Sequence, residues 1–86
     1  MSEGREWKEL RDAGLQMGIV GMLRLGPLSY RMMAGVMQKD LSLIAANCGE
    51  LTAKGWIVGV LLQGVKQVEL TEEGWRVAHA HFPSMQ

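Results

Sequence analysis

Residues 51–74 read LTAKGWIVGVLLQGVKQVELTEEG, and the pattern of this stretch changes twice. Its first residues predict the end of a helix, because Lys54 places a cation in the last turn and Gly55 can adopt a left-handed exit conformation. A nearly continuous β-prone run follows, Gln63-Gly64 is a turn signal, and apolar and polar residues then alternate. The stretch therefore predicts a two-stranded hairpin that follows one helix and precedes another.

The last helix is predicted to begin directly after the hairpin. Thr71 is a good N-cap residue, and Glu72 and Glu73 would place two carboxylates near the positive end of the helix dipole. We expect this helix to run to about Ala80, with Pro83 ending the ordered structure.

The first predicted helical segment covers residues 6–25, where apolar side chains recur at a spacing of three or four. Glycines at positions 14, 18 and 21 weaken a helix by about 1 kcal/mol each relative to alanine. Either a short leading helix breaks near Gly14, or the glycines face a neighbour that packs very close.

Two more helices are expected between this segment and the hairpin. Gly26-Pro27 ends the first segment, and Ser29 can cap a second helix over about 30–37. Asp40 or Ser42 can cap a third helix. The expected apolar members of that third helix are Leu43, Ile44, Ala45, Cys48 and Leu51.

The composition predicts one small globular domain with no net charge. With 86 residues, 48% of them hydrophobic and 21% charged, the chain can build one core, and we expect a single domain over 1–86 with its core in about 15–80. Nine basic residues balance nine acidic ones. General nucleic-acid binders are usually basic overall or along one face. Neutrality does not forbid DNA binding, but it removes the usual indication of it.

The sequence shows no catalytic motif and no set of metal ligands. It contains neither a phosphate-binding loop nor a nucleophile elbow, so we expect neither an enzyme nor a cofactor. His79 and His81 are two residues apart and would point to different faces of a helix. Cys48 is the only cysteine, which excludes an intramolecular disulfide and suggests a small buried hydrophobe.

No apolar run in the chain approaches the roughly 18 residues that a membrane span requires. Residues 1–8 are polar and lack the apolar core of a signal peptide. We therefore expect a cytoplasmic protein that has no membrane partner.

Three motifs, in this order and separation, resemble the winged helix-turn-helix family of bacterial, archaeal and phage regulators, in the style of the MarR and ArsR groups. The motifs are GPLSYR at 26–31, LTAKGWI at 51–57 and LTEEG at 70–74. The resemblance covers residues 15 to about 80 and assigns no subfamily. It implies a mainly α fold with a small β-hairpin wing, that is, an α+β winged helix-turn-helix domain.

In that family the third helix lies in the major groove, and the wing touches phosphate or the minor groove. The resemblance therefore points to the outward face of the third helix, to the wing tip and to both ends of the second helix. The implied DNA-binding positions are Ser29, Tyr30, Arg31, Lys39, Leu43, Ala46, Asn47, Glu50, Gln63, Lys66 and Gln67, with Arg24 as a further backbone contact. The third helix departs from the usual pattern, because among its own implied contacts only Asn47 is a typical reader of base edges.

Two functions remain open from the sequence. The first is a DNA-binding transcription regulator that acts as a homodimer, with Trp7, Leu10, Trp75 and Phe82 as candidate dimer or partner contacts. The second is a winged-helix module that binds a protein instead of DNA, such as a phage or mobile-element protein that blocks a host complex. The neutral charge and the poorly basic third helix favour the second function, whereas the resemblance favours the first.

Overall fold

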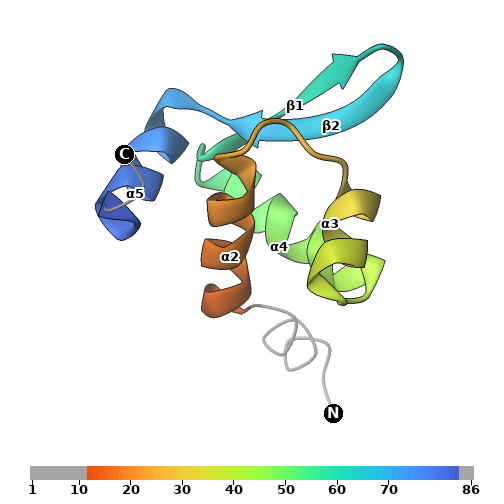
Figure 1. The fold of residues 1–86 in the computed structure, drawn as a ribbon, viewed down its shortest axis with the longest axis horizontal. Coiled ribbons are helices and arrows are strands. Elements are labelled where there is room, and N and C mark those ends of the chain that lie inside the picture. Colours follow the sequence, from red (N-terminus) through yellow and green to blue (C-terminus); the bar gives the residue numbers. More distant parts are fainter. Residues whose placement is uncertain (1–11, 84–86) are drawn as a thin grey trace.

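The computed structural model describes residues 12–83, which form a group of helices and one two-stranded sheet that projects from them (Figure 1). In chain order the elements of this part are α2 (Ala13–Leu23), α3 (Tyr30–Met37), α4 (Leu41–Ala53), β1 (Ile57–Leu62), β2 (Val65–Leu70) and α5 (Glu72–His81). This order confirms the predicted mainly α fold with a hairpin wing. None of the described helices is both long and apolar enough to cross a membrane. The predicted helical residues before position 12, Trp7 and Leu10 among them, lie outside the described residues.

Helix α2 begins at Ala13 because Asp12 caps it, with a carboxylate oxygen that accepts a hydrogen bond from the Leu15 amide at 3.0 Å. Two of its glycines face very close neighbours. A Cβ at position 18 would stand 2.9 Å from the methyl carbon of Met37, and one at position 21 would stand 3.1 Å from the ring of Phe82. Close packing, the second of the two alternatives, therefore explains Gly18 and Gly21.

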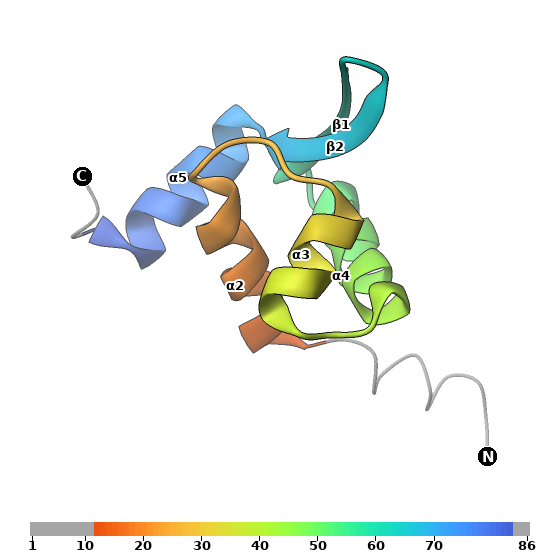
Figure 2. The ribbon, with the colours of Figure 1, turned by 45° about the vertical axis from the view of Figure 1, so that its right-hand side comes forward.

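The core lies where α2, α3 and α4 meet the base of the hairpin. Helices α3 and α5 lie on opposite sides of α2 (Figures 1 and 2). The buried apolar residues of the described chain are Leu15, Ile19, Val20, Leu23, Met33, Ile44, Cys48, Leu51, Ile57, Val68, Leu70 and Ala78. They come from all six elements, so each helix and each strand contributes to a single core.

The hairpin turns at Gln63-Gly64, as the sequence predicts. Leu62 pairs with Val65, which leaves two residues in the turn, and both have positive φ values, 51° and 78°. Positive φ at both central residues is the requirement of a type I′ turn, whose twist matches that of the strands. Leu28 and Val68 exchange two backbone hydrogen bonds of 3.1 and 2.9 Å, which tie β2 to the loop before α3.

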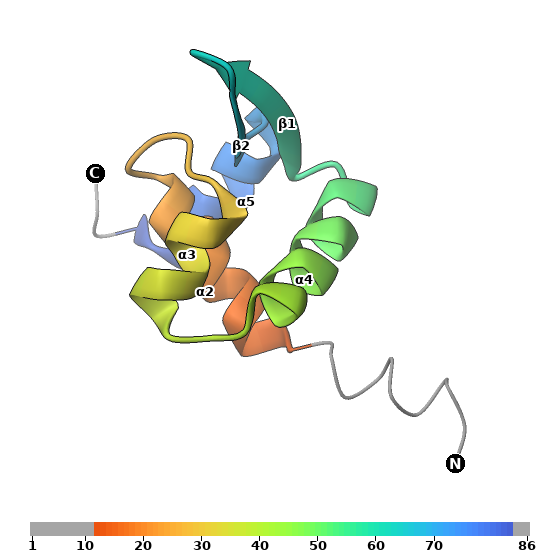
Figure 3. The same cartoon turned by 90° about the vertical axis from the view of Figure 1, so that its right-hand side faces the viewer.

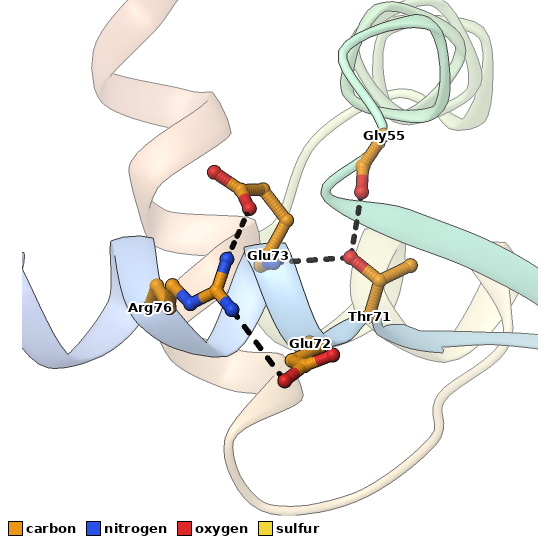
Figure 4. Close-up of polar contacts among 6 residues, drawn as sticks. Gly55, Thr71, Glu72, Glu73 and Arg76 are labelled. Atoms are coloured by element: carbon orange, nitrogen blue, oxygen red, sulfur yellow. Dashed lines mark hydrogen bonds and ion pairs between the residues drawn. The ribbon is translucent and has the colours of Figure 1, made fainter.

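The base of the wing is closed where α4 ends and α5 begins. The Thr71 hydroxyl donates a hydrogen bond to the Gly55 carbonyl at 2.6 Å and accepts one from the Gly74 amide at 3.0 Å (Figure 4). The Thr71 amide donates to the Trp56 carbonyl at 3.0 Å. Gly55 has φ 82°, which confirms the predicted left-handed exit from α4. Gly74 is buried directly against the Trp56 carbonyl, leaving no room for a side chain.

A buried polar network fixes α4 on α2. Asn47 is only 1% exposed, and its Oδ1 accepts hydrogen bonds from the Asp12 amide at 3.0 Å and from Gln16 Nε2 at 2.9 Å. Gln16 also donates to Glu50 Oε1 at 2.8 Å and accepts from Lys54 Nζ at 3.3 Å. The prediction that Asn47 lies on the outward face of the helix is therefore wrong.

The helical spacing explains this placement of Asn47. It lies three residues after Ile44 and four before Leu51, in the middle of the buried stripe of α4. Its amide nitrogen donates to the Leu43 carbonyl at 2.9 Å, so the side chain can be buried with its hydrogen bonds satisfied.

We predict that Gly74→Ala lowers the free energy of unfolding by about 3 kcal/mol, because the new methyl group overlaps the Trp56 carbonyl. Gly49→Ala is the matched control, since a Cβ at that helical position meets nothing within 4 Å. It should stabilise the protein by about 0.5 to 1 kcal/mol. Urea unfolding would measure both, and equal stability of the two variants would contradict close packing at Gly74.

We also predict that Asn47→Ala lowers the free energy of unfolding by about 2 to 4 kcal/mol, because the buried Gln16 amide and the partly buried Asp12 backbone amide lose their acceptor. Ser42→Ala, at an exposed position of the same helix, should change it by less than about 0.5 kcal/mol. Thermal unfolding followed by circular dichroism would test this. A stable Asn47→Ala variant would show that the network does not hold α4 in place.

Candidate nucleic-acid interface

An open groove of about 600 Å³ lies between the start of α3, helix α4 and the wing. Its walls bring together five of the predicted DNA-binding residues. Three of them, Ser29, Tyr30 and Arg31, open α3, whereas Lys66 and Gln67 belong to β2. Figure 3 shows the wing above α3 and α4, so that segments more than thirty residues apart in the sequence form one surface.

The N-terminus of α3 contributes positive electrostatic potential to this groove. Ser29 caps the helix with a hydroxyl that accepts from the Met32 amide at 3.0 Å. The positive end of the helix dipole therefore lies beside Arg31, which is exposed in the first turn. Lys66, also exposed, adds a second cation from the wing. An elongated anion, such as a sugar-phosphate backbone, would be attracted from both walls.

Tyr30 lines the groove and lies near Cys48, which is buried in the core. Burial, and after it the nearby Cys48, raise the pKa of the Tyr30 phenol above its ordinary value. Burial also raises the pKa of the Cys48 thiol to about 11. Cys48 is therefore a protonated thiol at neutral pH, without nucleophilic character. Its full burial confirms the prediction of a small buried hydrophobe.

The exposed face of α4 differs from the face that the sequence indicated. Leu43 packs against the core, Ala46 is half-buried, and Glu50 is half-buried and bonded to Gln16. The exposed residues of α4 are Leu41, Ser42, Gly49, Thr52 and Ala53. Apart from Leu41, the side chains of this face are small, and none is charged. The backbone of the helix can therefore approach a binding partner closely.

Three other predicted DNA contacts lie away from the groove walls. The guanidinium carbon of Arg24 lies 4.2 Å from the centroid of the Phe82 ring, and its Nε donates to the Gly21 carbonyl at 3.0 Å. Arg24 therefore packs on the side formed by α2 and α5, and it does not line the groove. Lys39 is exposed in the turn between α3 and α4, and Gln63 is exposed at the wing tip.

The groove also contains residues that the sequence did not indicate, namely Leu41, Thr52, Gly59, Val65 and Val68. They join the site because the hairpin folds back over α3 through its bridge at Leu28. Gly59 and Val68 pair across the two strands and therefore lie on the same face of the hairpin. No sequence signal indicates which helices that face would meet.

A second hollow, of about 660 Å³, lies between α2 and α5. It includes two of the predicted partner contacts. Trp75 is 38% exposed there, next to Leu25, which is 86% exposed. Phe82 packs against Gly21 and Arg24 of its own chain, so part of its surface is already used.

The two histidines of α5 take part in ring contacts. The rings of Trp75 and His79 lie 5.7 Å apart, and those of His81 and Phe82 lie 4.9 Å apart. Among residues 12–83, no group of three or more His, Cys, Asp or Glu side chains is arranged to hold a metal ion.

No protein-family model matches the sequence, and no curated protein is similar enough in sequence to count as a relative. Solved structures do match the fold. MarR from E. coli, in its oxidised form, superposes with a TM-score of 0.78 at 19% identity, over 91% of this chain and 59% of its own. The transcriptional regulator BldR from Sulfolobus solfataricus superposes with a TM-score of 0.74 at 24% identity, over 80% of this chain and 52% of its own.

FabT from Streptococcus pneumoniae, solved in complex with DNA, superposes with a TM-score of 0.73 at 16% identity, over 80% of this chain and 51% of its own. The chain thus spans between 51% and 59% of the length of these three proteins. At such low identities the likeness concerns the fold alone. Residues 12–83 of this chain have the winged helix-turn-helix fold, in the arrangement found in MarR.

Proposed function

We propose that this chain is a DNA-binding module of a transcription regulator, with α4 in the major groove and the wing against the DNA backbone. The observation that carries the proposal is the groove with Arg31 on one wall and Lys66 on the other. A second support is that BldR, a transcriptional regulator, and FabT, solved with DNA, have the same fold. Such a function belongs in the compartment that holds the DNA, which agrees with the cytoplasmic location expected from the sequence.

The backbone contacts follow from the groove walls. Arg31 and Lys66 would pair with phosphates, and the hydroxyl of Tyr30 and the amide of Gln67 would donate hydrogen bonds to phosphate or sugar oxygens. These contacts set the position of the domain on the duplex, but they carry no direct sequence information.

Base recognition would then depend on the uncharged face of α4. The hydroxyl of Ser42 can contact base edges, and Leu41 and the Thr52 methyl group can contact thymine methyl groups. The Thr52 hydroxyl already donates a hydrogen bond to the Cys48 carbonyl at 2.9 Å. Because the exposed residues Ser42, Gly49 and Ala53 are small, the helix can lie deep in the major groove. The module would then recognise its DNA sequence without a contact between an arginine and a guanine.

The alternative, a module that binds only proteins, is less favoured. The neutral face of α4 would suit a protein partner. That function assigns no specific role to the two cations across the groove, however, and the regulators that share the fold give it no support. DNA binding accounts for both features, and a non-catalytic role fits both functions.

We propose a homodimer as the form that binds DNA, through the hollow between α2 and α5. Leu25 and Trp75 are exposed large apolar side chains there, on a surface that does not line the groove. A single small module buries too little area for tight specific binding, whereas a dimer contacts two half-sites.

The DNA proposal predicts a shallow salt dependence that depends on the groove cations. With random-sequence duplex DNA, Arg31→Ala and Lys66→Ala should each reduce the slope of log K against log salt by about 0.9 and weaken binding to all duplexes alike. Arg76→Ala is the control, because Arg76 pairs with Glu73 at 2.7 Å on α5, away from the groove. Fluorescence anisotropy over a range of salt concentrations would measure the slopes. Salt slopes of Arg31→Ala and Lys66→Ala that equal the slope of the control would contradict the assignment.

The dimer proposal predicts that Trp75→Ala combined with Leu25→Asp converts a dimer into a monomer at micromolar concentration, because an apolar contact is removed and a charge is buried. Val36→Asp, at a 65% exposed position of α3, should leave the dimer unchanged. Sedimentation equilibrium would decide, and a parent protein that sediments as a monomer would refute the proposal.

A further inference from the structure

The outer edge of strand β1 lacks the features that usually protect an edge strand. Its sequence, IVGVLL over Ile57–Leu62, contains no charged residue and no proline. Its register with β2 is continuous, so no bulge twists the edge away. Lysine, proline or a bulge usually protects such an edge, because an open edge can pair with a strand of another chain. The outer edge of β1 is therefore suited to strand pairing.

The hydrogen bonds of the hairpin show which backbone groups of β1 point outward. Leu28 exchanges two backbone hydrogen bonds with Val68 on the other side of β2, so the N–H and C=O of Val68 point away from β1. Opposite residues of an antiparallel pair alternate between hydrogen-bonded and non-hydrogen-bonded pairs. Gly59 pairs with Val68, so its N–H and C=O point away from β2. By the same alternation, those of Ile57 and Leu61 also point outward.

Only part of this edge is accessible to another strand. Gly59 is exposed, and Leu61 is 71% exposed. Within residues 12–83, no other segment forms a backbone hydrogen bond with either of them. Ile57 is only 2% exposed, because it packs into the core at the base of the wing. The accessible edge therefore covers residues 58–62 and offers two N–H and two C=O groups.

A second copy of the same edge fits these groups in one antiparallel register. We infer that two copies of the chain pair through β1, with Val60 of one copy opposite Val60 of the other. Gly59 of each copy then lies opposite Leu61 of the other, and each such pair exchanges two hydrogen bonds. The two hairpins form one four-stranded antiparallel sheet with a twofold axis at Val60.

The side chains fit this register on both faces of the sheet. On one face, Leu61 of each copy covers Gly59 of the other, where a Cβ would have only one neighbouring atom within 4 Å. On the opposite face, Val58, Val60 and Leu62 of the two copies form a continuous apolar strip. No like charges oppose each other, because β1 is uncharged. Symmetry therefore makes a second copy complementary to this edge.

The contact is small, so it joins copies that are already close together. An edge of five residues is about 17 Å long. It buries far less than the about 800 Å² that each partner of a stable interface buries. Its setting rests on the proposed function, because copies on neighbouring stretches of one duplex have a high effective concentration. The edge of β1 is separate from the hollow between α2 and α5, so both contacts can form together.

Disulfide trapping tests this register in the absence of DNA. Val60→Cys places two thiols in a non-hydrogen-bonded pair, with Cα atoms about 4.5 Å apart, which a disulfide can span. Val58→Cys and Leu62→Cys are the matched controls, because each native side chain is 43% exposed. In either control alone the two thiols lie four residues apart along the strands, about 14 Å. In an equal mixture of the two controls, Cys at 58 lies opposite Cys at 62.

The covalent dimers would be followed on non-reducing gels in a glutathione redox buffer, and mass spectrometry would identify the heterodimer of the mixture. Cys48 should not react, because it is buried and burial raises the pKa of its thiol to about 11. The parent protein, which has no other cysteine, gives the background rate.

We expect Val60→Cys and the mixture to form covalent dimers at least about tenfold faster than either control alone, at equal protein concentration. Adding Leu61→Pro to Val60→Cys should lower the rate to that of the controls. The proline removes an outward N–H and leaves the hydrogen bonds between β1 and β2 in place. If circular dichroism shows that the proline variant does not fold, the cysteine variants alone decide, since they preserve every backbone N–H.

Two results would overturn the inference. Equal rates for the mixture and for its two components would indicate random collisions, as expected if the edge binds a foreign peptide or nothing. A fast reaction of Val58→Cys alone would require a parallel register. Neither result bears on the proposed DNA binding, and a parent protein that binds no duplex would leave the trapping result unchanged.

Discussion

The contact between Gly74 and the Trp56 carbonyl is the constraint on which the rest of this domain depends. It allows α5 to begin directly beneath the exit from α4, and Thr71 completes the closure by its hydrogen bond to Gly55. Because both ends of the hairpin are held at this point, the wing has a defined direction relative to α4. The groove between the wing and α3 exists only because that direction is defined.

The surface beside this groove has an unusual balance of charge and shape for a DNA-binding domain. The exposed face of α4 carries no charge, and the two cations lie on the walls formed by α3 and β2. In the proposed complex, affinity would come from a few phosphate contacts, whereas selectivity would come from shape and from apolar contacts with bases. A chain with zero net charge can work in this way, because the positive potential is needed only along one groove.

The side formed by α2 and α5 is separate from this groove. Gly21 lets the Phe82 ring pack tightly against α2, and Arg24 covers that ring. Leu25 and Trp75 remain exposed beside them. Self-association and DNA binding would therefore use different surfaces, which is the arrangement that a dimeric DNA-binding protein requires.

The sequence by itself determined the order and the ends of most elements, because these depend on local chemistry. Ser29 and Thr71 cap their helices, Gly55 takes the left-handed exit, and Gln63-Gly64 forms the turn as predicted. Only the tertiary structure decided which face of α4 is outward. The buried position of Asn47 requires partners from α2, more than thirty residues away, and local spacing cannot specify a satisfied polar residue in an apolar stripe. The sequence likewise indicates several candidate cations but not which of them lie together. Because the wing folds over α3, Arg31 and Lys66 line the groove, whereas Arg24 packs against Phe82.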